Sequence, residues 1–137
     1  MDNEVPSPNT PHKSLAPMLS VRRGAEAVEF YKAAFGAREL FRIGDEGEAV
    51  VAQLAVGESE FWVADESPEH FNFSPESLGG STARMVMVVS DPDAAFERAV
   101  SAGATVVWAV ADQPYGWRVG RDHDEGNPQP VLIRVMN

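Results

Sequence analysis

An internal repeat constrains this chain more than any other feature of its sequence. One copy reads SLAPMLSV, GAEAVEFYKAAFG, RELFRI, EAVVAQLAV and EFWVAD, the pattern of a strand, a helix and three strands. About 68 residues later the same order returns as ARMVMVV, DPDAAFERAVSAG, TVVWAVA, WRVGRD and PVLIRV. Each copy is one supersecondary unit, and the two units bury apolar surface by packing against each other. The sequence therefore predicts an α+β fold of two repeated βαβββ modules, each with a mixed four-stranded sheet.

The two helices can be given ends from the sequence. A helix over residues 24–35 ends at Gly36, which can adopt the left-handed conformation that terminates helices. A second helix over residues 92–102 begins with Asp91 as N-cap and Pro92 at its first position. Their apolar positions recur at helical spacing: Val28, Tyr31 and Phe35 in the first, and Phe96, Ala99 and Val100 in the second.

Composition outside the repeat predicts the domain organisation. Residues 1–13 hold three prolines and no apolar period, so we expect a flexible N-terminal tail. Residues 14–137 are expected to form a single domain, with modules at about 14–65 and 83–136. The segment 66–82, rich in Pro, Ser and Gly, is too long for a hairpin and is either a linker or a lid. With few apolar anchors, it should be among the more mobile parts.

The charge balance and the absence of cysteine narrow the classes of function. Eleven Lys and Arg against 21 Asp and Glu give a formal charge of −10. Such a field repels phosphate backbones, so no nucleic-acid partner is expected. Without cysteine, thiolate chemistry is excluded. No signal-peptide pattern opens the chain and no apolar run reaches the ~18 residues of a membrane span, which predicts a cytoplasmic protein without membrane attachment.

The repeated segments FYKAAFGARELFR and VSDPDAAFERAVSAGATVV resemble the vicinal oxygen chelate superfamily of glyoxalase, bleomycin-resistance and extradiol dioxygenase proteins. The second half also carries an aromatic-Gly-x-Arg-x-Gly turn that matches a bacterial branch of the family, at Tyr115, Gly116, Arg118 and Gly120. The resemblance covers about residues 14–135. It implies that each module curls into half of a cup that holds a small molecule, and that two chains pair as a homodimer.

Metal-using members of this family place His or Glu ligands on the inward faces of the first and fourth strands of each module. The matching positions here are Ala16, Trp62, Arg84, and Val131 or Leu132. None of these side chains is a metal ligand, and Arg84 would repel a cation. The resemblance thus implies a protein without metal or cofactor. Because a slip of one residue turns a strand side chain to the opposite face, a misaligned ligand set stays an alternative.

The stretch GRDHDEGNPQP, residues 120–130, admits two interpretations. His123 with the neighbouring Asp122 and Asp124 could hold a metal ion, or the stretch is a solvated turn made of good turn formers. Gly126 is not at the position that a calcium-binding EF-hand loop requires, counting from Asp122. The solvated turn is the favoured interpretation.

Five residues are the candidates for ligand binding. Arg84 breaks an apolar strand pattern and is expected to bind an anionic group of a ligand; the alternative is a strand-end charge that reaches water or pairs with Glu60. Trp62, Tyr115 and Trp117 are expected to line the cup, and Glu60 could place one carboxylate in it. Trp108 is expected in the core or in an interface.

These observations favour a metal-free small-molecule-binding protein of the glyoxalase/bleomycin-resistance type, with the ligand in an aromatic-lined cup. Two alternatives remain. One is a metal-dependent lyase, isomerase or dioxygenase, for which His70 is the best general-base candidate. The other is an interaction protein whose cup is filled by its own side chains. The sequence does not establish whether any reaction is catalysed.

Overall fold

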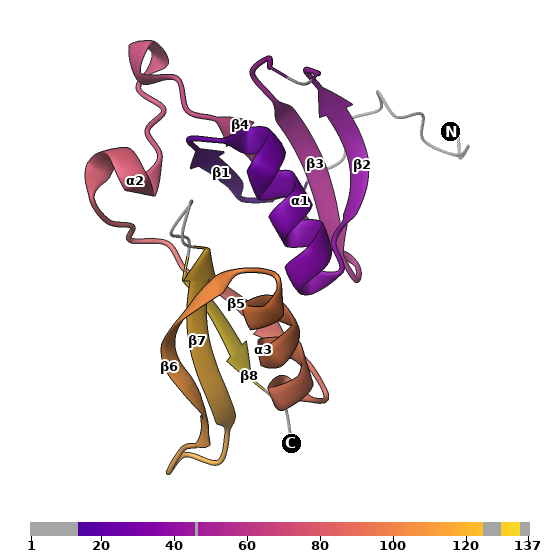
Figure 1. The fold of residues 1–137 in the computed structure, drawn as a ribbon, viewed down its shortest axis with the longest axis vertical. Coiled ribbons are helices and arrows are strands. Elements are labelled where there is room, and N and C mark those ends of the chain that lie inside the picture. Colours follow the sequence, from indigo (N-terminus) through magenta and orange to yellow (C-terminus); the bar gives the residue numbers. More distant parts are fainter. Residues whose placement is uncertain (1–13, 46, 125–129, 135–137) are drawn as a thin grey trace.

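The computed structural model describes residues 14–45, 47–124 and 130–134, and the side chains of residues 14–45 and 47–122. The strands form two separate mixed sheets, in the orders β1-β4-β3-β2 and β5-β8-β7-β6 (Figure 1). In each sheet the first strand runs parallel to the last, and the other pairs are antiparallel. The predicted α+β fold of two βαβββ modules is confirmed.

The bounds of the elements follow the predicted segments closely. The first module consists of β1 (Met18–Val21), α1 (Gly24–Phe35), β2 (Arg38–Ile43), β3 (Val51–Val56) and β4 (Ser59–Asp65). The second consists of β5 (Met85–Val88), α3 (Pro92–Ser101), β6 (Ala104–Asp112), β7 (Arg118–Asp124) and β8 (Pro130–Arg134). β7 extends two residues beyond its expected end, so His123 and Asp124 belong to a strand rather than to a turn. Residues 1–13 and 125–129 lie outside the described residues.

Local sequence explains how the two helices begin and end. Gly36 has a φ of 69°, and its N–H donates to a carbonyl of the last turn of α1. The Asp91 carboxylate accepts from the Ala94 N–H at 3.1 Å, as expected of an N-cap. α1 has no side-chain cap at Arg23; the Gly24 N–H instead donates to Asp65 at the end of β4, at 2.9 Å.

The two modules meet through their helices. α1 and α3 pack together, and Ala34, Ala99 and Ala104 form a small buried cluster between the modules. The Arg98 guanidinium crosses this contact and donates to the carbonyl of Ala33 at 2.8 Å. Small side chains let the helices approach closely, and the arginine satisfies a carbonyl near the end of α1.

The connecting segment is more ordered than the sequence suggested. It contains a short 3-10 helix, η1 (Pro68–His70), and a one-turn helix, α2 (Pro75–Leu78) (Figure 1). Ser74 is fully buried, and its hydroxyl accepts from the Ser77 N–H at 3.1 Å. Polar contacts take the place of the apolar anchors that the sequence lacks, and the expected mobility of the segment stays a prediction. No helix in the described residues is long and apolar enough to cross a membrane.

Candidate functional site

Each sheet has one face covered by its helix and one that is not, which we call the open face. In β4 the buried Phe61 and Val63 face α1, so Trp62 between them belongs to the open face. In β7, a Cβ on Gly120 would lie 3.0 Å from the Phe96 ring of α3, which places Gly120 on the covered face. Its neighbour Arg121 therefore belongs to the open face.

Residues that pair across neighbouring strands form a row across each sheet. The two modules have equivalent rows on their open faces. On the first open face the row runs through Met18, Trp62, Gln53 and Phe41. On the second it runs through Val86, Leu132, Arg121 and Trp108. Both rows end at an irregularity in the outer strand, next to Phe41 and next to Trp108. Phe41 thus corresponds to Trp108, and Gln53 corresponds to Arg121.

The aromatic and polar side chains of the first row contact side chains of their own sheet. The Phe41 and Trp62 rings meet edge to face with centroids 6.0 Å apart. The Gln53 side-chain amide donates to Glu60 at 2.8 Å. Glu60, predicted to enter the cup or to pair with Arg84, has its partner on the neighbouring strand. The polar and aromatic groups of this row therefore already have partners.

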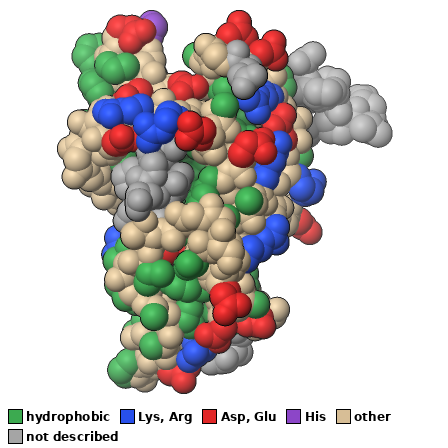
Figure 2. Space-filling model, viewed as in Figure 1, with side chains coloured by type: hydrophobic (Ala, Val, Ile, Leu, Met, Phe, Trp, Pro, Cys, Tyr) green, Lys and Arg blue, Asp and Glu red, His purple; other side chains and the backbone are tan. Residues whose placement is uncertain are grey.

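Two members of the second row, Val86 and Trp108, are exposed, while Arg121 is half-buried. Trp108 is 41 % exposed, Val86 is 53 % exposed and Val107, beside Trp108 at the bulge, is 43 % exposed. Figure 2 shows hydrophobic side chains at the surface of the second module. Trp108 was expected in the core or in an interface. Its exposure shows that the core placement is wrong, and the interface placement stays a prediction.

Two arginines of the second module, one on β7 and one directly before β5, differ from the other arginines whose side chains are described. Most arginines have a partner, which is a carboxylate for some and a backbone carbonyl for others: Arg22, Arg23, Arg38, Arg42, Arg98 and Arg118. Within the described residues, Arg84 and Arg121 have no hydrogen bond or ion pair, although the Nε of Arg121 is buried. Sequence analysis missed Arg121, because only the pairing of β6 with β7 places it beside Trp108.

The predicted site residues are divided between the two sheets. Trp62 and Glu60 lie on β4, while the exposed Arg84 directly precedes β5. The Tyr115 and Trp117 rings meet edge to face, 5.2 Å apart, in the turn between β6 and β7. Tyr115 is 61 % exposed and Trp117 is 40 % exposed. A common site for these residues within one chain stays a prediction.

Register also decides between the two matched positions on β8. Leu132 pairs with Val86 and Arg121, residues of the open face, whereas Val131 pairs with Met85 and Asp122 of the covered face. Leu132 is therefore the counterpart of Trp62. No group of three or more His, Asp or Glu residues able to hold a metal occurs where side chains are described. Of the possible metal ligands Asp122, His123 and Asp124, only Asp122 has a described side chain.

A groove of about 530 Å³ lies between the modules and runs along β5, with Val86 and Val88 as well as Met85 and Met87 in its wall. Its walls are mainly apolar and include Tyr31, Phe35, Phe61, Met85 and Met87. Among the residues whose side chains are described, Arg98 is the only charged one in the wall, and carbonyls of α1 already accept from its guanidinium. The groove has a suitable volume for a small molecule but few free polar groups to orient one. None of the predicted site residues lines it.

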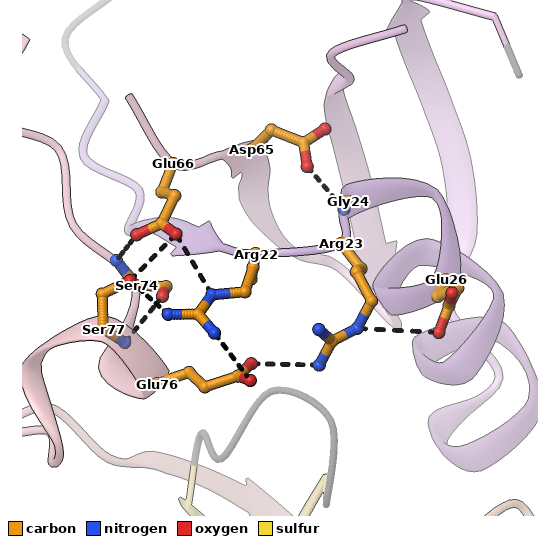
Figure 3. A network of polar contacts seen from close by, with 9 residues as sticks. All are labelled: Arg22, Arg23, Gly24, Glu26, Asp65, Glu66, Ser74, Glu76 and Ser77. Carbon is orange, nitrogen blue, oxygen red and sulfur yellow. Dashed lines mark hydrogen bonds and ion pairs between the residues drawn. The ribbon is translucent and has the colours of Figure 1, made fainter. Parts of the chain in front are cut away.

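A polar network fastens the connecting segment to the first module (Figure 3). Glu66 accepts from the Ser74 N–H at 2.8 Å and from the Ser77 hydroxyl at 2.9 Å, and these hydrogen bonds hold its pKa at about 2. Arg22 donates to Glu76 at 3.1 Å and to the Ser77 hydroxyl at 2.8 Å. His70, the candidate base, is exposed in η1 with its Nδ1 2.7 Å from the Ser67 hydroxyl. The segment is fixed at the edge of β1 and not over the second open face.

Comparison with known proteins agrees with this geometry. Residues 14–127 match the model of the glyoxalase/bleomycin resistance protein/dioxygenase superfamily. An uncharacterized protein of Mycobacterium bovis is 40 % identical over 111 residues, which cover 78 % of this chain and 73 % of that protein.

Solved structures show the same fold. A gene product from Arabidopsis thaliana aligns with a TM-score of 0.71 and 28 % identity, over 92 % of this chain and 99 % of that one. TioX from Micromonospora sp. aligns with a TM-score of 0.68 and 24 % identity, over 91 % and 97 %. With two βαβββ modules and a family match across most of its length, the chain belongs to the glyoxalase/bleomycin resistance protein/dioxygenase superfamily.

Proposed function

We propose that the chain binds a small organic molecule against the open face of its second sheet, and that it holds this molecule without a metal ion. The observation that carries the proposal is the row of Val86, Arg121 and Trp108, in which Val86 and Trp108 are exposed and Arg121 is half-buried, with the exposed Val107 beside it. A contiguous apolar surface with a few polar groups at its rim is typical of a binding site. Arg84, directly before β5, and Tyr115 and Trp117, in the turn between β6 and β7, belong to the same module.

The residues at the matched ligand positions support binding without a metal. Met18 pairs with Trp62, which places Ala16 two residues before this row, and Arg84 stands two residues before Val86 in the second module. An alanine, a tryptophan and an arginine offer no lone pair to a cation. If a metal were bound, its ligands would have to come from other positions, as in the alternative of a metal-dependent lyase, isomerase or dioxygenase.

We also propose that two copies pair and close the cup. β1 and β5 each end their sheet on one side, with no further strand pairing among the described residues. The open faces bear Phe41, Ile43 and Trp108, which are 41–58 % exposed. Unpaired edges and exposed apolar faces on both modules suit a symmetric partner. In such a dimer, Trp62 and Glu60 of one copy would approach Arg84 of the other.

A thermal-shift screen of small organic acids and cationic antibiotics tests the binding function. At least one compound should raise the melting temperature, and Trp108→Ala should abolish that rise because it removes the largest exposed surface of the row. Phe71→Ala is the matched control, since Phe71 is 85 % exposed on the connecting segment, away from the second sheet. A screen without any shift, or a shift that survives Trp108→Ala, would contradict the proposal.

Metal content tests the second part of the proposal. Protein purified without chelator should contain no stoichiometric metal, and titration with Zn, Ni, Mn and Fe(II) should leave its melting temperature unchanged. Retention of one metal per chain would favour the lyase, isomerase or dioxygenase alternative. Sedimentation analysis should show a dimer, and a monomer at micromolar concentration would contradict the paired cup.

A further inference from the structure

We infer that Arg121 and Arg84 make the second open face selective for a planar aromatic carboxylate. This inference rests on the proposed binding function and names the ligand class of the same site. Because the chain is acidic, the lack of a partner for these two arginines is informative about the ligand. With 21 acidic residues against 11 basic ones, an arginine has no shortage of potential partners. Two arginines that pair with none of the described residues, in one module, therefore indicate an external acceptor.

Arg121 is the stronger of the two indications. Its side chain is half-buried and its Nε is buried, yet no described residue accepts from that atom. A buried donor without an acceptor costs free energy that folding does not recover. A ligand carboxylate would satisfy it, because the planar fork of a guanidinium donates two parallel hydrogen bonds to the two oxygens of a carboxylate.

The residues next to Arg121 indicate what the apolar part of the ligand would be. Trp108 pairs with Arg121 across β6 and β7, and it offers an indole that is 41 % exposed. Val86 continues the row on β5 and is 53 % exposed. A flat apolar ring fits against this surface, while its carboxylate reaches the guanidinium.

Arg84, which directly precedes β5, supplies a second positive charge beside the same sheet. β5 and β7 are separated only by β8, so the two arginine positions are about 10 Å apart across the sheet. Arg84 stands two residues before Val86, roughly 7 Å along the strand direction from the row of Arg121. Two long guanidinium side chains can converge on one bound anion across this separation. They also offset the net negative charge of the chain, which would otherwise repel an anion.

The equivalent position in the first module shows that this charge is not a requirement of the fold. Gln53 takes the place of Arg121, and its amide is bound to Glu60. The same sheet position therefore accepts a neutral side chain with an internal partner. The arginine in the second module is then explained by what it binds rather than by the architecture.

Isothermal titration calorimetry with 2-naphthoate and its neutral counterpart 2-naphthamide tests the inference on the full chain. The wild type should bind 2-naphthoate at least 10-fold more tightly than 2-naphthamide. Arg121→Met should weaken 2-naphthoate by about 10- to 100-fold, the scale of a hydrogen bond to a charged group, and change 2-naphthamide by less than twofold. Arg121→Lys should give an intermediate loss, because it keeps the charge but not the fork.

The controls separate this inference from the binding function itself. Arg38→Met removes an exposed arginine of the first module whose partner is the Gly57 carbonyl, and it should leave both probes unaffected. If Arg121→Met fails to fold, as judged by its melting temperature, Arg84→Met provides the same comparison from an exposed position. Equal binding of both probes by the wild type would overturn the carboxylate selectivity and leave small-molecule binding intact. Binding of neither probe would count against both proposals.

Discussion

The two modules share one strand order, yet they bury their side chains very differently. In the first, Val21, Leu54 and Val63 are completely buried against α1. In the second, Met85 and Met87, the residues of β5 that face α3, are only half-buried around Phe96. The repeat thus fixes the strand order, while the extent of burial on the helix-covered face differs between the two copies. Among the described side chains, most of the buried core belongs to the first module.

The modules also start their helices by different means. α3 is capped by Asp91, its own N-cap residue, whereas α1 is held by Asp65 from the end of β4. Asp65 additionally accepts from the Val50 N–H at 2.7 Å, before β3. One carboxylate therefore joins the helix of the first module to its sheet, while the cap of the second acts within a single turn.

Matched valine truncations should show the largest difference between the modules. Val63→Ala should lower the free energy of unfolding by about 2 to 3 kcal/mol, because it removes buried methyl groups and leaves a cavity. Val107→Ala, at a position 43 % exposed, should cost less than about 1 kcal/mol. Urea denaturation of both variants measures this, and equal losses would show that the second open face is covered in solution.

The two carboxylate caps give the next largest contrast. Asp65→Ala should cost about 2 kcal/mol, because two backbone N–H groups lose a charged acceptor. Asp91→Ala should cost about 1 kcal/mol, as is usual for an N-cap. Hydrogen exchange should show local opening confined to α3 in the second variant and reaching β3 in the first. A larger loss for Asp91→Ala would contradict the assigned roles.

Acid should selectively weaken the attachment of the connecting segment to the first module. The pKa of Glu66 is about 2, below its ordinary value of 4.5. Because the folded-state pKa is the lower one, the carboxylate stabilises the fold above about pH 4.5 and this contribution is lost as the pH falls toward 2. Glu66→Gln should flatten the pH dependence of the melting temperature across that window. Glu69→Gln, on the exposed η1, serves as the control and should keep the wild-type profile.

The aromatic pair of the first open face should give the smallest effect. A double-mutant cycle of Phe41→Ala and Trp62→Ala should yield a coupling of about 0.5 to 1 kcal/mol, typical of an edge-to-face pair. A cycle between Phe41 and Trp108, equivalent residues on separate sheets, should yield none in an isolated chain. Measurable coupling there would show that the two open faces meet in the proposed dimer.

The sequence by itself determined the fold class and most element bounds. The repeat, the helical spacing of Val28, Tyr31 and Phe35, and the terminating Gly36 are local patterns, so they are legible without knowledge of distant neighbours. The same holds for the N-cap Asp91 and for the two-residue turn at Gly57, whose φ is 59°. Each depends on residues only a few positions apart.

Tertiary structure alone decided which polar side chains are free and which already have partners. Glu60 is held by Gln53, and Glu66 is held by Ser74, Ser77 and Arg22, pairs that lie 7 to 44 residues apart in the chain. Arg121 stands beside Trp108 only because β6 and β7 pair with a bulge at that point. Side-chain pairing of this kind depends on strand register and on how segments pack, and neither is encoded in the spacing of residues along a single strand.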